Sequence, residues 1–172
     1  MRVLLSAFMV SLALFFASCH QGSLRSVESD LNPPLEGLQG VWQSDREGTV
    51  YDKENRKNLD PRFLDAMKDT FGYLLHTFEK DIVTISDPRD DSVFRSRVKV
   101  LESNEDRVLL EMRMIDIEGE SLVNAVDFLE KVGAESRQAE EVQIQFDGDE
   151  AYWLVMTLTT GKVLRERFRR IK

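Results

Sequence analysis

Histidine is the side chain that most often acts as a general base near neutral pH, and this chain has two, His20 and His76. His20 lies near the N-terminus, so His76 is the only histidine of the predicted folded domain. It alternates with Leu74 and Phe78 along a predicted strand, which predicts a packed position in the wall of the fold. A Ser-His-Asp relay would also need a sharply turned serine, and the sequence Gly-x-Ser-x-Gly that provides this turn is absent. We therefore expect His76 to be structural.

Carboxylates are plentiful, and they gather in two places where they could bind a metal ion. These clusters are Asp87, Asp90 and Asp91 around Pro88, and Asp147, Asp149 and Glu150 around Gly148. Neither has the spacing of a calcium-binding loop with its terminal bidentate glutamate, so we interpret both as solvated hairpin turns. The single cysteine, Cys19, excludes an intrachain disulfide and zinc sites of the Cys₄ type. We predict neither a metal nor a cofactor.

Charge and glycine pattern exclude further classes of function. The 23 basic and 31 acidic residues give a net charge of −8, which argues against nucleic-acid binding. A glycine-rich phosphate loop is absent. The one basic concentration is Arg165, Arg167, Arg169, Arg170 and Lys172, which we interpret as a charged outer face that balances nearby acids; the alternative is a patch for anionic lipid or an acidic partner. We predict that the protein is not an enzyme, since catalysis would need a polar cluster inside the fold around Glu166 or Arg170.

The N-terminus carries an export signal over residues 1–18. Arg2 supplies the positive charge, residues 3–16 are almost entirely apolar, and Ala17 and Ser18 are the small residues that a signal peptidase requires. The apolar run is too short to span a bilayer as a mature helix. Cys19 follows directly.

The run Phe16-Ala17-Ser18-Cys19 resembles the lipobox of bacterial lipoproteins, although that family usually has leucine where Phe16 stands. The resemblance implies cleavage before Cys19 and its acylation with two or more chains such as palmitate, which anchor stably to a membrane. His20 in place of aspartate implies the outer membrane of the cell envelope, facing the periplasm. The alternative is an ordinary secretory signal with a coincidental cysteine beside the cleavage site.

Behind the anchor we expect a tether and one folded domain. Residues 19–36 are the predicted lipidated cysteine and flexible tether, and the prolines of Asn32-Pro33-Pro34 are expected to lie outside helices and central strands. Residues 37–172 form the predicted domain. A chain of 172 residues with 42% hydrophobic residues is long enough to bury one core.

The pattern of the domain predicts a mainly β fold with one or two short inserted helices. Asp60-Pro61 and the apolar spacing of Phe63, Leu64, Met67 and Phe71 predict a helix that ends near Gly72. A second helix is expected over 121–132. Strands are predicted over 41–51, 73–79, 82–86, 93–101, 107–117, 141–146, 151–160 and 162–171. Consecutive antiparallel hairpins of about eight strands are best closed into an up-and-down barrel, because closure removes exposed edges.

The opening Gly40-Val41-Trp42 resembles the Gly-x-Trp of lipocalins and related small barrels. The resemblance implies that an arginine near the end of the last strand, Arg167, Arg169 or Arg170, stacks on Trp42 and closes one end of the barrel with a cation–π contact. The helix after the first strand departs from typical lipocalins. The chain therefore resembles bacterial lipocalin-like domains of unassigned function.

Alternation predicts a largely apolar barrel interior. We expect a non-catalytic, lipid-anchored envelope protein that binds a small apolar ligand in the barrel. The candidate lining residues are Leu110, Met112, Phe146, Tyr152, Leu154 and Met156. The alternative is a filled barrel that serves as a structural module or binds another envelope protein.

Overall fold

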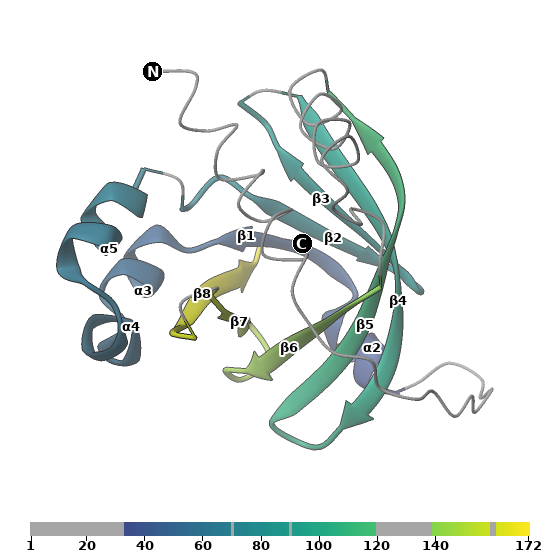
Figure 1. The fold of residues 1–172 in the computed structure, drawn as a ribbon. Coiled ribbons are helices and arrows are strands. Elements are labelled where there is room, and N and C mark those ends of the chain that lie inside the picture. The colour runs from purple at the N-terminus through teal and green to yellow at the C-terminus, as the bar shows by residue number, and fades with distance from the viewer. Residues whose placement is uncertain (1–32, 70, 90, 120–138, 159–160) are drawn as a thin grey trace.

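The fold is a closed barrel of eight antiparallel strands in chain order, which confirms the predicted fold class. The computed structural model describes residues 33–172 apart from 70, 90, 120–138 and 159–160 (Figure 1). The strands are β1 (Gly40–Ser44), β2 (Leu75–Glu79), β3 (Ile82–Asp87), β4 (Ser92–Ser103), β5 (Arg107–Glu118), β6 (Glu140–Phe146), β7 (Ala151–Thr157) and β8 (Val163–Arg170). β1 pairs with both β2 and β8, which closes the ring.

The first strand is shorter than predicted, and the prediction of a strand over 41–51 is wrong beyond Ser44. Two short helices follow instead, α3 (Arg46–Val50) and α4 (Lys53–Asn58). Asp45 begins α3 by accepting a hydrogen bond from Gly48 N, and Asp52 begins α4 by accepting one from Asn55 N. These carboxylates satisfy backbone donors that a helix start leaves free, and so favour helix over strand.

The predicted helix after Asp60 is present as α5 (Pro61–Met67), although it ends before Gly72. Asp60 accepts a hydrogen bond from Arg62 N, and Pro61 occupies the first turn, as expected from its fixed φ. Phe71 follows the helix and is fully buried. The second predicted helix, over 121–132, lies outside the described residues.

A further helix, α2 (Pro33–Leu38), begins at the two prolines. The expectation that they lie outside helices is therefore wrong, because the first turn of a helix needs no backbone N–H donors. Leu38 at the end of α2 is fully buried, and its carbonyl accepts a hydrogen bond of 2.7 Å from Trp42 Nε1. None of the helices in the described residues is long and apolar enough to cross a membrane.

Helices α3 and α4 take the place of a strand beside the upper part of β8. Beyond Ser44, Asp45 N donates to Arg167 O at 2.7 Å. The buried Asn55 then pairs with the backbone of Arg165 on both sides: its Nδ2 donates to Arg165 O at 2.7 Å and its Oδ1 accepts from Arg165 N at 2.8 Å. One side-chain amide thus makes the two hydrogen bonds that a neighbouring strand would make.

Aromatic side chains fill the lower end of the barrel, which is the end beside α2. We call Trp42, His76, Phe78, Tyr152 and Phe168 the base cluster; all have at most 4% of their surface exposed. The ring of Phe168 stacks on His76 at a centroid distance of 4.0 Å and on Tyr152 at 5.1 Å. A second apolar group is formed around Phe71 and Leu164. It packs the segment that runs from α4 to Phe71 against β8.

Candidate functional site

The upper part of the barrel has an apolar inner wall that is only half buried. We call the upper wall the side chains of Phe94, Met112, Met114, Leu154 and Met156. Their cross-strand partners are buried, in the pairs Ile85–Phe94, Val98–Met112, Ser96–Met114, Leu154–Glu166 and Met156–Leu164. Since partners in register lie on the same face of a sheet, the upper wall faces the barrel interior and is nevertheless accessible.

A carboxyl group lies inside the barrel beside this wall. Glu166 on β8 is 1% exposed, and Ser44 Oγ donates a hydrogen bond of 2.5 Å to its Oε1. The same hydroxyl accepts a hydrogen bond of 2.9 Å from Gly72 N. Burial raises the pKa of Glu166 to about 7, against the opposing effect of the hydrogen bond from Ser44. The barrel therefore contains a carboxyl that changes charge near neutral pH.

A second polar pair belongs to the base cluster. His76 Nδ1 lies 2.7 Å from the hydroxyl of Tyr152. Burial lowers the pKa of His76 to about 3, so the ring is neutral, and the predicted packed position of this histidine is confirmed. Burial, and then the charge of Glu166, raise the pKa of Tyr152 well above its usual value.

Ser96 carries the third polar group of the interior. It lies on β4, its partners in register are Val83 of β3 and Met114 of β5, and it is 1% exposed. Its Oγ has no hydrogen-bond partner among the described residues. A buried hydroxyl without a partner costs about 1–3 kcal/mol, so this atom marks a position where a bound polar group would be stabilised.

Glu140 adds a second inward carboxyl near the upper end of β6. It pairs with Met112 and is half buried. Burial raises the pKa of Glu140 to about 8. Among the described strand residues, Arg170 is the one lysine or arginine on the inner face, and it lies at the lower end. Asp87 at the end of β3 also faces inward, where it pairs with Arg89. The upper interior is therefore apolar with acidic groups.

The six candidate lining residues fall into three places. Met112, Leu154 and Met156 belong to the upper wall, where they are half buried. Leu110 and Tyr152 are fully buried in the core. Phe146 lies at the lower end, where its ring is 3.9 Å from the position that a Cβ at Gly37 would take. The structure does not bring the six together at one site.

Trp42, Arg170 and Gly40 lie together at the lower end of the barrel. The guanidinium carbon of Arg170 is 4.3 Å from the ring centroid of Trp42, and its nitrogens donate to Gln39 O and Gly37 O. Gly40 has φ of +116°, and a Cβ there would lie 2.4 Å from Lys172 O, so only glycine fits.

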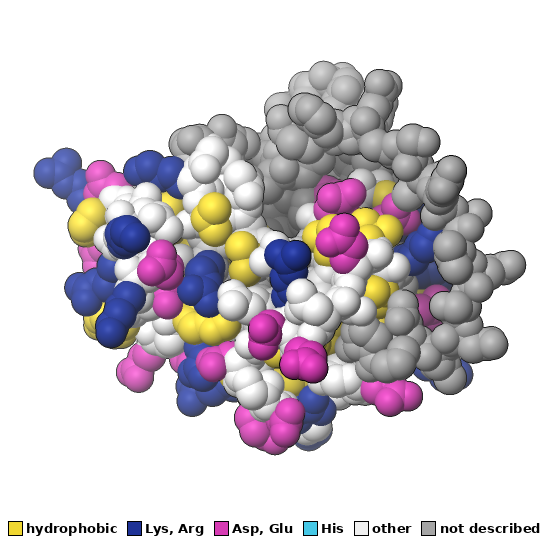
Figure 2. All heavy atoms as spheres, turned by 90° about the horizontal axis from the view of Figure 1, so that it is seen from below, with side chains coloured by type: hydrophobic (Ala, Val, Ile, Leu, Met, Phe, Trp, Pro, Cys, Tyr) yellow, Lys and Arg dark blue, Asp and Glu magenta, His cyan; other side chains and the backbone are white. Residues whose placement is uncertain are grey.

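The other two arginines expected as partners of Trp42, Arg167 and Arg169, face outward. Arg167 bonds to Asp45 and Asp147, and Arg169 also bonds to Asp45. Figure 2 looks onto the lower end and shows acidic and basic side chains interspersed with hydrophobic ones. This pairing favours the interpretation of the basic run as a balanced outer face.

The two acidic clusters are parts of hairpin turns, but the first is not fully solvated. Asp87 is 2% exposed and bonds to Arg89. Burial alone would raise the pKa of Asp87, but the hydrogen bonds and charge of Arg89 outweigh it and lower that pKa. Asp90 lies outside the described residues. Within the described residues, no group of three or more metal-ligating side chains comes together.

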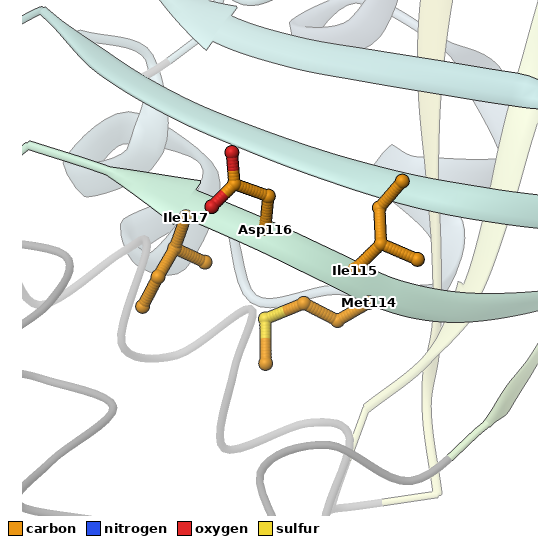
Figure 3. A pocket seen from close by; sticks show the side chains of 4 residues that line it. All are labelled: Met114, Ile115, Asp116 and Ile117. Atoms are coloured by element: carbon orange, nitrogen blue, oxygen red, sulfur yellow. The ribbon is translucent and has the colours of Figure 1, made fainter.

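Two of the hollows among the described residues lie near the two ends of the barrel, and the first includes Met114 of the upper wall. One of about 90 Å³ is lined by β5 from Met114 to Ile117. Here Met114 and Ile117 point to one side of the strand, and Ile115 and Asp116 to the other (Figure 3). The register shift between Arg95 and Ser96 explains this, because it leaves one extra residue on β5. A larger hollow of about 910 Å³ lies at the lower end beside Phe146, Asp149 and Arg170.

Sequence reasoning missed the inward polar residues Ser44, Ser96 and Glu140. Alternation places each on the same face as its apolar neighbours, and this could have flagged them. Glu166, which the sequence analysis names as a candidate for an inner polar cluster, lies inside the barrel.

Comparison with known proteins adds little to this geometry. No protein-family model matches the chain, and no curated protein is similar to it in sequence. Among solved structures, a redesigned β barrel aligns with 84% of this chain and 100% of its own length, at 11% identity and a TM-score of 0.39. The fold assignment rests on the strand pairing of the chain itself.

Proposed function

We propose that the chain is an exported lipoprotein whose barrel binds a small apolar ligand against the upper wall. The observation that carries the proposal is the half burial of five inward apolar side chains whose cross-strand partners are buried. The protein would be non-catalytic and anchored through Cys19 to the outer membrane, facing the periplasm.

The chemistry of the upper wall suits this role. Covering apolar surface gains about 25 cal/mol per Å², so a ligand that fills the upper interior is stabilised by burial alone. Three of the five side chains are methionines, which adapt their shape to irregular partners. A mostly apolar lining with a few polar groups is typical of small-molecule sites.

The test uses residues 21–172, which contain all eight strands and both apolar clusters. Native mass spectrometry should find an added mass that organic solvent removes. The fluorescent apolar probe N-phenyl-1-naphthylamine should bind as well. Met112→Trp fills the upper interior and should weaken binding of the probe about tenfold. The matched control is Ile115→Trp on the same strand, where Ile115 is 49% exposed.

Two results would refute ligand binding. One is a wild-type protein that neither carries an added mass, even after incubation with envelope lipids, nor binds the probe. The other is equal binding of the probe by Met112→Trp and wild type.

The filled base cluster favours a second candidate function, a structural or protein-interaction module that works through its outer surface. It differs observably from the first: the purified protein would have the bare polypeptide mass and would bind no apolar probe.

The anchor has a separate test. Cells that express the full chain should incorporate labelled palmitate into the protein, and Cys19→Ala should abolish this label. A Cys19→Ala protein that still carries the label, or a wild type without it, would contradict the lipoprotein proposal.

A further inference from the structure

The inner face of the barrel indicates which head group a ligand would carry. We infer that the ligand is an amphiphile whose head group donates hydrogen bonds and bears no negative charge, such as a long-chain amine or alcohol. This inference rests on the proposed function and names its ligand class. Its basis is the set of polar groups around the upper wall: Glu166 with Ser44, the unpartnered Ser96, and Glu140.

Glu166 is the strongest acceptor inside the barrel. Its carboxyl group has two oxygens, and Ser44 donates to Oε1. An ionised carboxylate accepts about four hydrogen bonds and donates none. A head group that reaches it must therefore be a donor, and an ammonium group would form a charge-assisted pair, which is stronger than a neutral hydrogen bond.

Ser96 faces the interior from the opposite wall. β4 and β8 are separated by three strands on either side of the eight-stranded ring, so Ser96 and Glu166 approach the interior from opposite directions. The Ser96 hydroxyl has no partner among the described residues and is buried. It can donate or accept, so it suits an amine or a hydroxyl head equally.

The inner face of the barrel would repel an anionic head group. Glu166 faces inward and is ionised above pH 7, and an anionic head group beside it would be repelled in an interior of low dielectric constant. The nearby arginines already have partners: Arg46 of α3 bonds Phe71 O and the Tyr73 hydroxyl, and Arg89 bonds Asp87. Arg170 bonds backbone carbonyls at the lower end. The arginines flanking Glu166, Arg165 and Arg167, lie on the outer face.

The same geometry gives the orientation of the ligand. Leu154 pairs with Glu166 and Met114 with Ser96, so the polar groups lie in the same rows as the upper wall. The base cluster closes the barrel beneath them. The head group would therefore lie beside Glu166 and Ser96, above the base cluster, and the apolar chain would run along the upper wall toward the upper end.

The experiment compares three ligands with the same chain. Dodecylamine, dodecanol and dodecanoic acid displace N-phenyl-1-naphthylamine from residues 21–172 at about pH 8, where the ordinary carboxyl is ionised and the amine is charged. The buffer contains salt, which screens the attraction between the acidic protein surface and protonated dodecylamine. The amine should bind about tenfold or more tightly than the acid, with the alcohol between them. Equal or tighter binding of the acid overturns the inference but leaves the proposed function standing, whereas failure of the probe itself to bind overturns the proposed function.

Two variants test which residue causes the preference for the amine over the acid. Glu166→Gln should reduce the ratio of amine to acid affinity severalfold, whereas Glu150→Gln, which removes an exposed carboxyl in the turn before β7, should leave it unchanged. An unchanged ratio in a folded Glu166→Gln protein overturns the assignment of Glu166. If Glu166→Gln does not fold, Ser96→Ala is the deciding variant. It should weaken the binding of dodecanol severalfold and leave the binding of the probe unchanged. Equal binding of dodecanol by Ser96→Ala and wild type overturns the inference.

Discussion

The base cluster and the upper wall are built from the same alternating strands, yet they differ in what covers them. In the base cluster, aromatic rings contact one another, Leu38 of α2 joins the same core, and Arg170 lies over Trp42. In the upper wall, the side chains are aliphatic or sulfur-containing except for Phe94, and they remain half buried. Alternation thus determines which residues face inward, but the size of the side chains and the terminal helix determine whether the interior is filled.

The largest effect should come from the base cluster. Trp42→Ala removes a side chain that is 1% exposed, together with its hydrogen bond to Leu38 O and its contact with Arg170. We expect a loss of about 3–5 kcal/mol in the free energy of unfolding. Urea denaturation followed by circular dichroism measures it. A loss below about 1 kcal/mol would mean that the lower end is not the stabilising half of the barrel.

A matched pair of leucines compares the two regions directly. Leu110 is fully buried, whereas Leu154 is a half-buried member of the upper wall. Leu110→Ala should cost about 3 kcal/mol, and Leu154→Ala about 1 kcal/mol, because only the first leaves an enclosed cavity. The same urea experiment applies to both. Equal losses would remove the distinction between a filled and an open half.

These comparisons also show what the sequence could predict. The eight strands and α5 follow from alternation and from Asp60-Pro61, signals that depend on near neighbours. The end of β1 could not be found in this way, because the caps Asp45 and Asp52 interrupt a run that otherwise suits a strand. Their effect depends on Asn55 meeting the backbone of Arg165, which is 110 residues away.

The site was predictable only in part, for a related reason. Alternation correctly places Met112 and Leu154 on the inner face, but it equally selects Leu110 and Tyr152, which are fully buried. A pattern of period two gives the face of a sheet and carries no information on depth along the barrel. Depth depends on how the register of eight strands accumulates around the ring.

The carboxyl of Glu166 should make the stability of the barrel depend on pH. Its pKa is about 7 in the folded protein against 4.5 as the ordinary value, so the folded state retains the proton more strongly. Stability is therefore fully present below pH 4.5 and decreases as the pH rises to about 7. The difference amounts to at most about 3 kcal/mol.

Glu166→Gln isolates this effect, because His76 and Glu140 titrate equally in both proteins. The lowered pKa of His76, about 3 against 6.5, acts in the opposite direction and reduces stability as the pH falls. The stability of Glu166→Gln relative to wild type should increase by about 2–3 kcal/mol between acidic and mildly alkaline pH, measured by urea denaturation. Glu150→Gln should show no such change. A constant difference across the range would place Glu166 in contact with water.

The smallest effect should have the opposite sign, and it concerns the boundary between the two regions. Ser96 is buried, and its hydroxyl lacks a partner among the described residues, so the free protein bears the cost of desolvating it. Ser96→Ala should therefore stabilise the ligand-free protein by about 1 kcal/mol, whereas Ser103→Ala, at the exposed end of the same strand, should change nothing. Thermal unfolding with and without dodecanol measures both consequences, because the ligand should stabilise wild type more than Ser96→Ala. A destabilised Ser96→Ala protein would show that the hydroxyl already has a partner in the free barrel, and the polar groups of the upper interior would then be structural.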